Sequence, residues 1–128
     1  MSRDATIMLP WADGDHTFRL GWGELELLQE ACDAGPYVIL NRLFDESWKI
    51  GDISNTLRLG LIGGGMTPGS ALKLTRTYVE KRPPVENLVF AQAVLSAGCI
   101  GAPEERVGET GAPSPEAESD LTTSPTEN

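Results

Sequence analysis

The sequence predicts a mainly helical α+β domain, in which an N-terminal β-hairpin packs on about five short helices. Two observations predict this class. Apolar residues alternate with polar ones over the first twenty positions, and after Gly21 they recur at helical spacing as far as Gly101. Beyond Gly101 they nearly vanish. We therefore expect a single folded domain over residues 1–101 and a disordered acidic tail over residues 102–128.

The net charge of −9 is divided unequally along the chain. Residues 103–128 hold seven acids and one base, 1 − 7 = −6, and residues 1–102 hold twelve acids and nine bases, 9 − 12 = −3. Neither part suits a nucleic acid or an anionic membrane, which would repel it. No signal peptide and no stretch of about 20 apolar residues is recognisable. The sequence therefore predicts a cytoplasmic protein.

The hairpin is predicted from two alternating runs, residues 5–11 and 16–20, separated by an Asp13-Gly14 turn signal. Its apolar face comprises Ile7, Leu9, Trp11, Phe18 and Leu20. Two strands alone are not stable, so this face must cover helices. A short third strand over residues 48–50 is an open alternative.

Helical spacing and stop signals predict the helices 22–33, 36–46, 53–62, 68–81 and 85–99. Gly35 is expected to cap the first and Pro36 to begin the second, while Asp52 is expected to cap the third. The triple glycine 63–65 ends that helix, and Thr67-Pro68 begins the next.

The expected inward residues follow from the same spacing. They are Leu25, Leu28 and Cys32; Tyr37, Leu40 and Phe44; Ile53, Leu57 and Leu61; Leu72, Leu74, Tyr78 and Val79; and Leu88, Ala91, Gln92, Leu95 and Cys99.

Catalytic, cofactor and metal sites are not predicted. His16 lies beside the hairpin turn without a partner set for a triad or metal, and Asp13 and Asp15 lack the further ligands of a calcium loop. The triple glycine follows a helix and lacks the lysine of a phosphate loop, so a tight turn explains it better. Cys32 and Cys99 are expected to be buried, reduced thiols.

A helix-turn-helix is the sharpest alternative, since residues 53–62 and 68–81 flank a glycine turn. The second of these helices carries Lys73, Arg76 and Lys81, as a DNA-reading helix would. The acidic body lacks a wider basic footprint. We therefore expect these cations to form a solvated face and to pair with Glu80 or neighbouring acids.

The string Leu57-Arg58-Leu59-Gly60-Leu61-Ile62-Gly63-Gly64-Gly65 resembles the signature of the tail assembly chaperones of gene transfer agents and related long-tailed phages. Further motifs fit the same family in order, namely Gly21, Glu24 and Leu25; residues 32–36; residues 48–52; Tyr78-Val79; and Arg82-Pro83. The resemblance covers about residues 11–101.

This resemblance implies a non-enzymatic assembly factor. Proteins of this class coat the tape measure protein, keep its long apolar helices in solution and recruit tail tube subunits. A structural component of the tail is the alternative. The apolar surface offered to a partner is expected on the fifth helix, at Leu88 and Leu95, and around Trp22 and Trp48. A homo-oligomer is left open.

Overall fold

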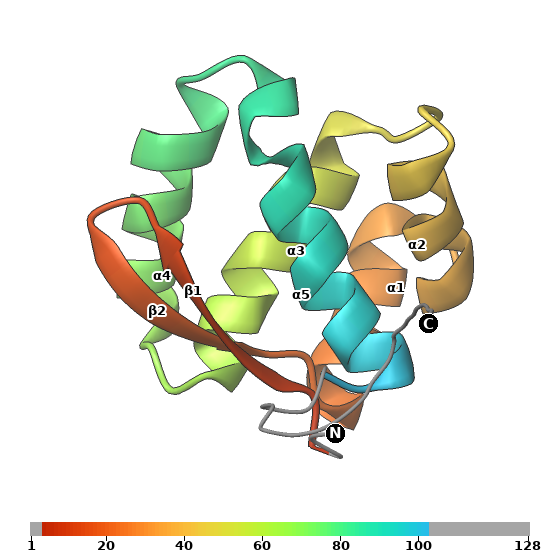
Figure 1. Cartoon of the computed structure of the whole chain (residues 1–128), viewed down its shortest axis with the longest axis horizontal. Helices are drawn as coiled ribbons and strands as arrows, with labels where there is room; N and C mark the ends of the chain where they lie inside the picture. The colour runs from red at the N-terminus through yellow and green to blue at the C-terminus, as the bar shows by residue number, and fades with distance from the viewer. Residues whose placement is uncertain (1–3, 103–128) are drawn as a thin grey trace, which may run out of the picture.

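The computed structural model describes residues 4–102. A two-stranded antiparallel sheet precedes the helices, so the predicted mainly helical fold is confirmed (Figure 1). The elements are β1 (Thr6–Trp11), β2 (Gly14–Arg19), α1 (Trp22–Cys32), α2 (Pro36–Phe44), α3 (Ile50–Gly63), α4 (Pro68–Thr75), the π-helix η1 (Arg76–Glu80), the 3-10 helix η2 (Pro84–Asn87) and α5 (Leu88–Ile100). The expected tail lies outside the described residues except for Ala102, which is buried.

The hairpin has a two-residue loop one position earlier than expected. Trp11 pairs with Gly14, which leaves Ala12 and Asp13 as the loop. Ala12 takes the left-handed φ of 58°, and Gly14 does not. The Asp13-Gly14 signal thus located the turn but misplaced its strained residue. The apolar face was predicted correctly, because Phe18 and Leu20 are fully buried and Trp11 nearly so.

Glycines let β2 lie directly against the end of α3. A Cβ on Gly63 would overlap the carbonyl oxygen of Arg19, and a Cβ on Gly64 would overlap that of Thr17. Gly65 takes a positive φ of 114° and turns the chain towards α4. The triple glycine is therefore a tight turn, as expected, but the close neighbour is a strand rather than a helix.

Helices α1 and α2 are joined at a left-handed aspartate. Asp33, with φ 54°, caps α1 in place of the expected Gly35, which instead precedes α2. Pro36 occupies the first position of α2 as predicted. At the start of α1, the carboxylate of Glu24 accepts from the backbone N–H of Gly21 at 3.0 Å.

The buried side of α2 differs from the prediction. Ile39, Leu40 and Leu43 face the core, whereas Tyr37 and Phe44 are exposed. The helix is shorter than expected and packs on α1 on one side and α5 on the other, so the buried stripe is rotated towards Ile39. The spacing of the apolar residues predicted the helix, but it did not predict which side of the helix is buried.

No third strand forms among residues 4–102, because Ile50 begins α3 and the sheet has two strands. Asp52 consequently lies inside the first turn of α3 rather than at its cap. Its carboxylate accepts from the backbone N–H of Lys49 at 2.8 Å, which closes a capping box. Ile53, Leu57 and Leu61 are buried as predicted.

The predicted fourth helix is divided into α4 and η1. The Thr67 hydroxyl accepts from the backbone N–H of Ser70, which confirms it as the cap. Ala71, Thr75 and Val79 supply the buried side, while Leu72 is exposed. A five-residue π turn follows α4. The buried stripe is centred on the small residues Ala71 and Thr75, so the spacing of the large apolar residues placed Leu72 wrongly.

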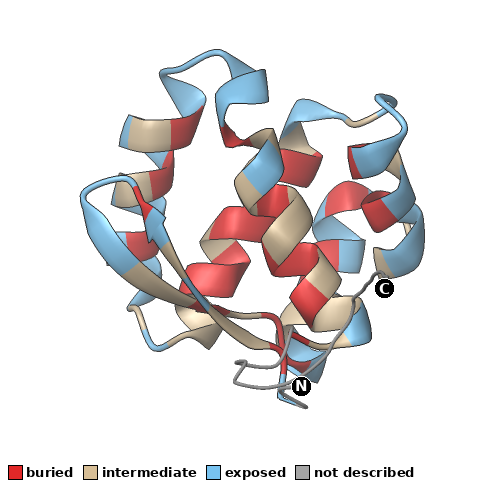
Figure 2. Cartoon of the chain, in the orientation of Figure 1, coloured by how far each residue is buried: buried red, intermediate tan, exposed pale blue. Residues whose placement is uncertain are grey.

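Helices α3 and α5 form the centre of the domain. Buried residues concentrate along α3 and on the side of α5 that faces it (Figure 2). Gly60 allows this close approach, since a Cβ there would lie 2.9 Å from Cγ1 of Val94. The hairpin, α1, α2 and α4 surround this pair (Figure 1).

Candidate partner-binding surface

The histidine and its neighbours form a surface pair beside the hairpin turn. His16 Nε2 lies 2.7 Å from Asp13 Oδ1, and this hydrogen bond lowers the pKa of the Asp13 carboxyl. Among residues 4–102, no group of three metal-ligating side chains comes together. The pair therefore links two residues at the hairpin turn.

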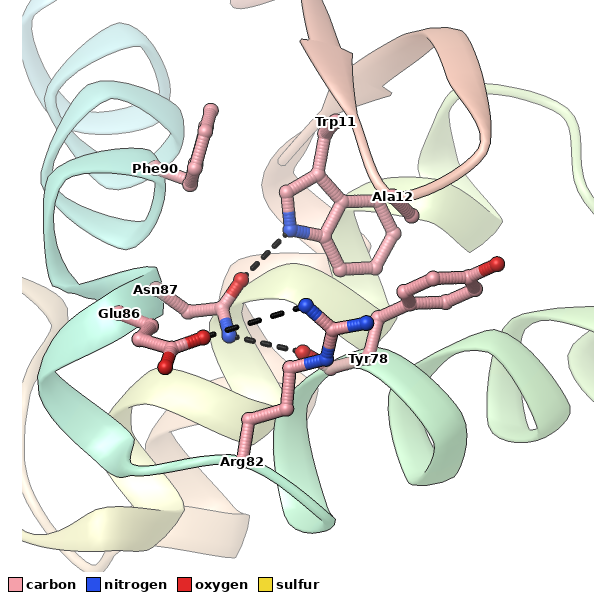
Figure 3. A pocket seen from close by; sticks show the side chains of 7 residues that line it. All are labelled: Trp11, Ala12, Tyr78, Arg82, Glu86, Asn87 and Phe90. Carbon is pink, nitrogen blue, oxygen red and sulfur yellow. Dashed lines mark hydrogen bonds and ion pairs between the residues drawn. The ribbon is translucent and has the colours of Figure 1, made fainter.

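The cavity between the hairpin and the helices η1 and η2 has structural hydrogen bonds in its wall (Figure 3). Trp11 Nε1 donates to Asn87 Oδ1 at 2.7 Å, and Asn87 Nδ2 donates to the carbonyl of Tyr78 at 2.9 Å. Arg82 lies over the Tyr78 ring and within 3.9 Å of Glu86. These polar groups hydrogen-bond to one another. Through Asn87, the hydrogen bonds link the hairpin to η1 and η2. Sequence spacing gave no signal for Asn87.

Neither cysteine is in a disulfide. Burial raises the pKa of the Cys32 thiol to about 11, and the nearby Asp52 charge acts in the same direction. Burial also raises the pKa of Cys99, which is half-buried rather than fully buried as expected. Both thiols are poor nucleophiles at neutral pH, because the thiolate is the reactive form.

Of the four residues expected at the partner surface, only Trp22 is exposed, at 82%. Trp48 and Leu88 are partly buried against the core, and Leu95 is completely buried. Leu95 belongs to the hydrophobic core, so no partner reaches it without opening that core. That part of the prediction is corrected: Leu95 is a core residue.

Trp22 and Trp48 are also not brought together. Cys32 Sγ lies 3.7 Å from the carbonyl of Gly51, while Gly63 lies beside Glu24, so α1 and α3 run antiparallel. Trp22 therefore lies near the end of α3, and Trp48 precedes its start. The fourteen residues of α3 separate them by about 20 Å.

The fifth helix was expected to offer an apolar surface, but the residues exposed on its outer side are not the expected Leu88 and Leu95. None of its thirteen residues is charged, yet Val89 is 69% exposed and Ile100 is 60% exposed. Eleven positions apart, these two residues lie on the same side of the helix. The absence of charge over the whole helix was the available signal, but it equally indicated complete burial.

A second helix lies beside this surface. The side chain of Gln92 on α5 donates to the carbonyl of Leu43 on α2 at 2.9 Å, and the adjacent Phe44 is exposed. Phe44 of α2 and Val89 and Ile100 of α5 are thus exposed apolar side chains on two helices that contact each other. An exposed apolar surface of this kind is typical of a protein-binding site.

The comparison with known families decides what class of protein this is. A family described as "Phage tail tube protein, GTA-gp10" matches residues 4–101. This chain belongs to that family of phage tail proteins. No curated protein and no solved structure matches the chain.

The GTA-gp10 match covers nearly all described residues, including both strands and every helix. The family is one of phage tail proteins and is not an enzyme family, in agreement with the expectation of a non-enzymatic role. Within the described residues, none of the helices has the length and apolar content that crossing a bilayer demands.

Proposed function

We propose that this GTA-gp10 family member is a tail assembly chaperone, which binds the tape measure protein and recruits tail tube subunits. The observation that carries the proposal is the uncharged α5 helix, whose outer side exposes Val89 and Ile100. A tape measure protein presents long helices with apolar stripes. Such a helix is best protected by an apolar surface of another helix.

The binding surface proposed here comprises the outer side of α5 together with the exposed Phe44 of α2. Trp22 is proposed as a second contact, because its indole is mostly exposed and borders a cavity lined by Leu25 and Pro36. An exposed tryptophan beside an apolar cavity is a common anchor in protein interfaces. Trp48 and Leu88 are partly buried, so only the exposed part of each side chain is proposed to contact the partner.

The test is co-expression of the tape measure protein with and without this chain. The proposal predicts that the tape measure protein enters the soluble fraction and co-purifies only when the chain is present. An equal soluble fraction in both cultures would remove the basis of the proposal. Assembly before particle completion implies that the protein works in the cytoplasm of the producing cell.

A structural role in the finished tail is the second candidate, and the family description as a tail tube protein favours it. Mass spectrometry of purified particles separates the two roles. A chaperone is absent or present far below the tail tube subunit, whereas a structural component is present in fixed ratio to it.

A further inference from the structure

Charge is segregated along the described domain. Residues 20–41 hold four acids and no base, whereas residues 53–79 hold three bases and no acid. The helix α1 lies in the first range and α4 lies in the second. Both helices pack on α3, and they lie on opposite sides of the domain (Figure 1). The protein therefore presents an acidic helix on one side and a basic helix on the other.

One side of α1 carries two acids and a leucine, which we call the acidic face. It comprises Glu26, Leu27 and Glu30, which share one side because positions three and four apart are neighbours on a helix. All three are exposed, and Leu27 is 53% exposed. Neither carboxylate forms an ion pair with a described residue. The acidic face thus offers two unpaired charges beside an apolar side chain.

One side of α4 and the start of η1 has the complementary composition, and we call it the basic face. It comprises Leu72, Lys73 and Arg76, which are all exposed. Glu80 was expected to neutralise the bases of this segment, but no ion pair joins it to Lys73, Arg76 or Lys81. The basic face thus offers two unpaired positive charges beside an exposed leucine.

We propose that the acidic face of one copy of this chain binds the basic face of a second copy, with the two helices antiparallel. Glu30 then lies beside Lys73 and Glu26 beside Arg76, and the exposed leucine of each face is covered by the partner helix. The two faces lie on opposite sides of one chain, so each contact leaves one face of each kind free. The association therefore continues head to tail.

Glu80 favours the antiparallel direction. It lies one turn beyond Arg76, at the edge of the basic face, and also lines the cavity between η1 and the start of α3. In the antiparallel arrangement it faces the first turn of α1, where Trp22 and Gly23 are uncharged and the helix dipole is positive. In a parallel arrangement it would face the other end of α1, where Asp33 would repel it.

A second copy fits the basic face better than a nucleic acid does. Two bases on one helix side are a small footprint, and residues 1–102 carry a net charge of 9 − 12 = −3. A polyanion would therefore be repelled by most of the domain. The acidic face instead matches the basic face in length, in number of charges and in its single leucine. The proposal rests on these surfaces and goes beyond the role in tail assembly.

Sedimentation velocity of the purified full chain at low salt tests the proposal, because exposed charges are screened least there. We expect the average mass to exceed that of two chains as the protein concentration rises, and to fall when salt is added. Glu30→Lys and Arg76→Glu should each weaken the association at least about tenfold, since each change places like charges together. The control Glu46→Lys changes the charge equally at an exposed residue outside both faces and should associate as the wild type does.

An equimolar mixture of the Glu30→Lys and Arg76→Glu variants gives the sharpest result. The acidic face is intact in the second variant and the basic face is intact in the first. We therefore expect the mixture to associate at concentrations where each variant alone is monomeric. Glu80→Lys tests the direction, and it should weaken the association because it brings a positive charge to the positive end of α1. Stronger association in this variant would contradict the antiparallel arrangement.

A wild type that stays monomeric at every concentration would overturn the proposal, as would single variants that associate as strongly as the wild type. Association that only Val89→Glu abolishes would place the self-contact on α5 instead. A monomeric chain that retards duplex DNA, and loses this in Arg76→Glu, would assign the basic face to nucleic acid. None of these measurements involves the tape measure protein, so the proposal can fail while the proposed function stands.

Discussion

Arg42 and Asp52 join α2 to the first turn of α3 through a two-pronged ion pair. Arg42 Nη2 lies 2.7 Å from Asp52 Oδ1, and Nε lies 3.0 Å from Oδ2. The same carboxylate accepts from the backbone N–H of Lys49, and Asp52 is only 1% exposed. One buried side chain thus fixes both the start of α3 and the position of α2.

Asp52→Ala should lower the free energy of unfolding by about 3 kcal/mol, because it leaves the Arg42 charge and the Lys49 N–H without their partner. Urea unfolding followed by circular dichroism measures this. The control is Glu30→Ala, at an exposed position without an ion pair in the described residues, which should change stability by less than about 0.5 kcal/mol. An equal loss of stability in the two variants would show that the Arg42–Asp52 ion pair does not stabilise the fold.

Gly63→Ala should destabilise the domain by about 2 kcal/mol or more, because the new methyl group overlaps the backbone of β2 at Arg19. Gly23→Ala is the matched control, since nothing lies within 4 Å of its added Cβ. That change should raise stability by about 0.5 kcal/mol, because alanine favours the helix. Thermal unfolding of the two variants should therefore move in opposite directions, and a shared direction would contradict the packing described.

The Cys32 thiol should make stability fall at high pH. Its pKa is raised from 9.0 to about 11 in the folded chain, so between these values the unfolded state ionises while the folded state keeps its proton. The stabilisation is complete below pH 9 and is lost as the pH rises through 11. Urea unfolding between pH 8 and 10.5 should show a steeper loss for the wild type than for Cys32→Ala. Parallel slopes would contradict the raised pKa.

Truncation to alanine should affect the stability of the domain little at Trp22 and strongly at Leu95. Trp22→Ala should change the free energy of unfolding by less than about 0.5 kcal/mol, because the indole is mostly exposed. Leu95→Ala should cost about 3 kcal/mol through the cavity that it leaves. Weakened tape measure binding is expected from Trp22→Ala alone at temperatures where both variants are folded. Normal binding by Trp22→Ala would remove Trp22 from the proposed surface.

Element type and order followed from the sequence because local signals agreed with the fold. Alternation predicted both strands, and Thr67-Pro68 predicted the start of α4. The errors arose where the deciding contact is distant in sequence. The side of α2 that is buried depends on α1 and α5, so Tyr37 and Phe44 were expected inside although they are exposed.

The same reason limited the prediction of the site. Periodicity ranks residues by face, but it does not say which faces of an uncharged helix another element covers. In α5 it therefore chose Leu95, which is completely buried, and overlooked Val89, which is exposed. Trp22 was expected at the partner surface together with Trp48, but only Trp22 is exposed.

The most direct test of the proposed role uses two residues of similar exposure, Val89 on α5 at 69% and Met8 on β1 at 64%. Each is replaced by glutamate, and the amount of tape measure protein that co-purifies with the folded chain is measured. We expect Val89→Glu to reduce the recovered tape measure protein at least about tenfold, because a charge would be buried against an apolar helix, and Met8→Glu to leave it unchanged. Equal recovery with both variants would contradict binding through α5.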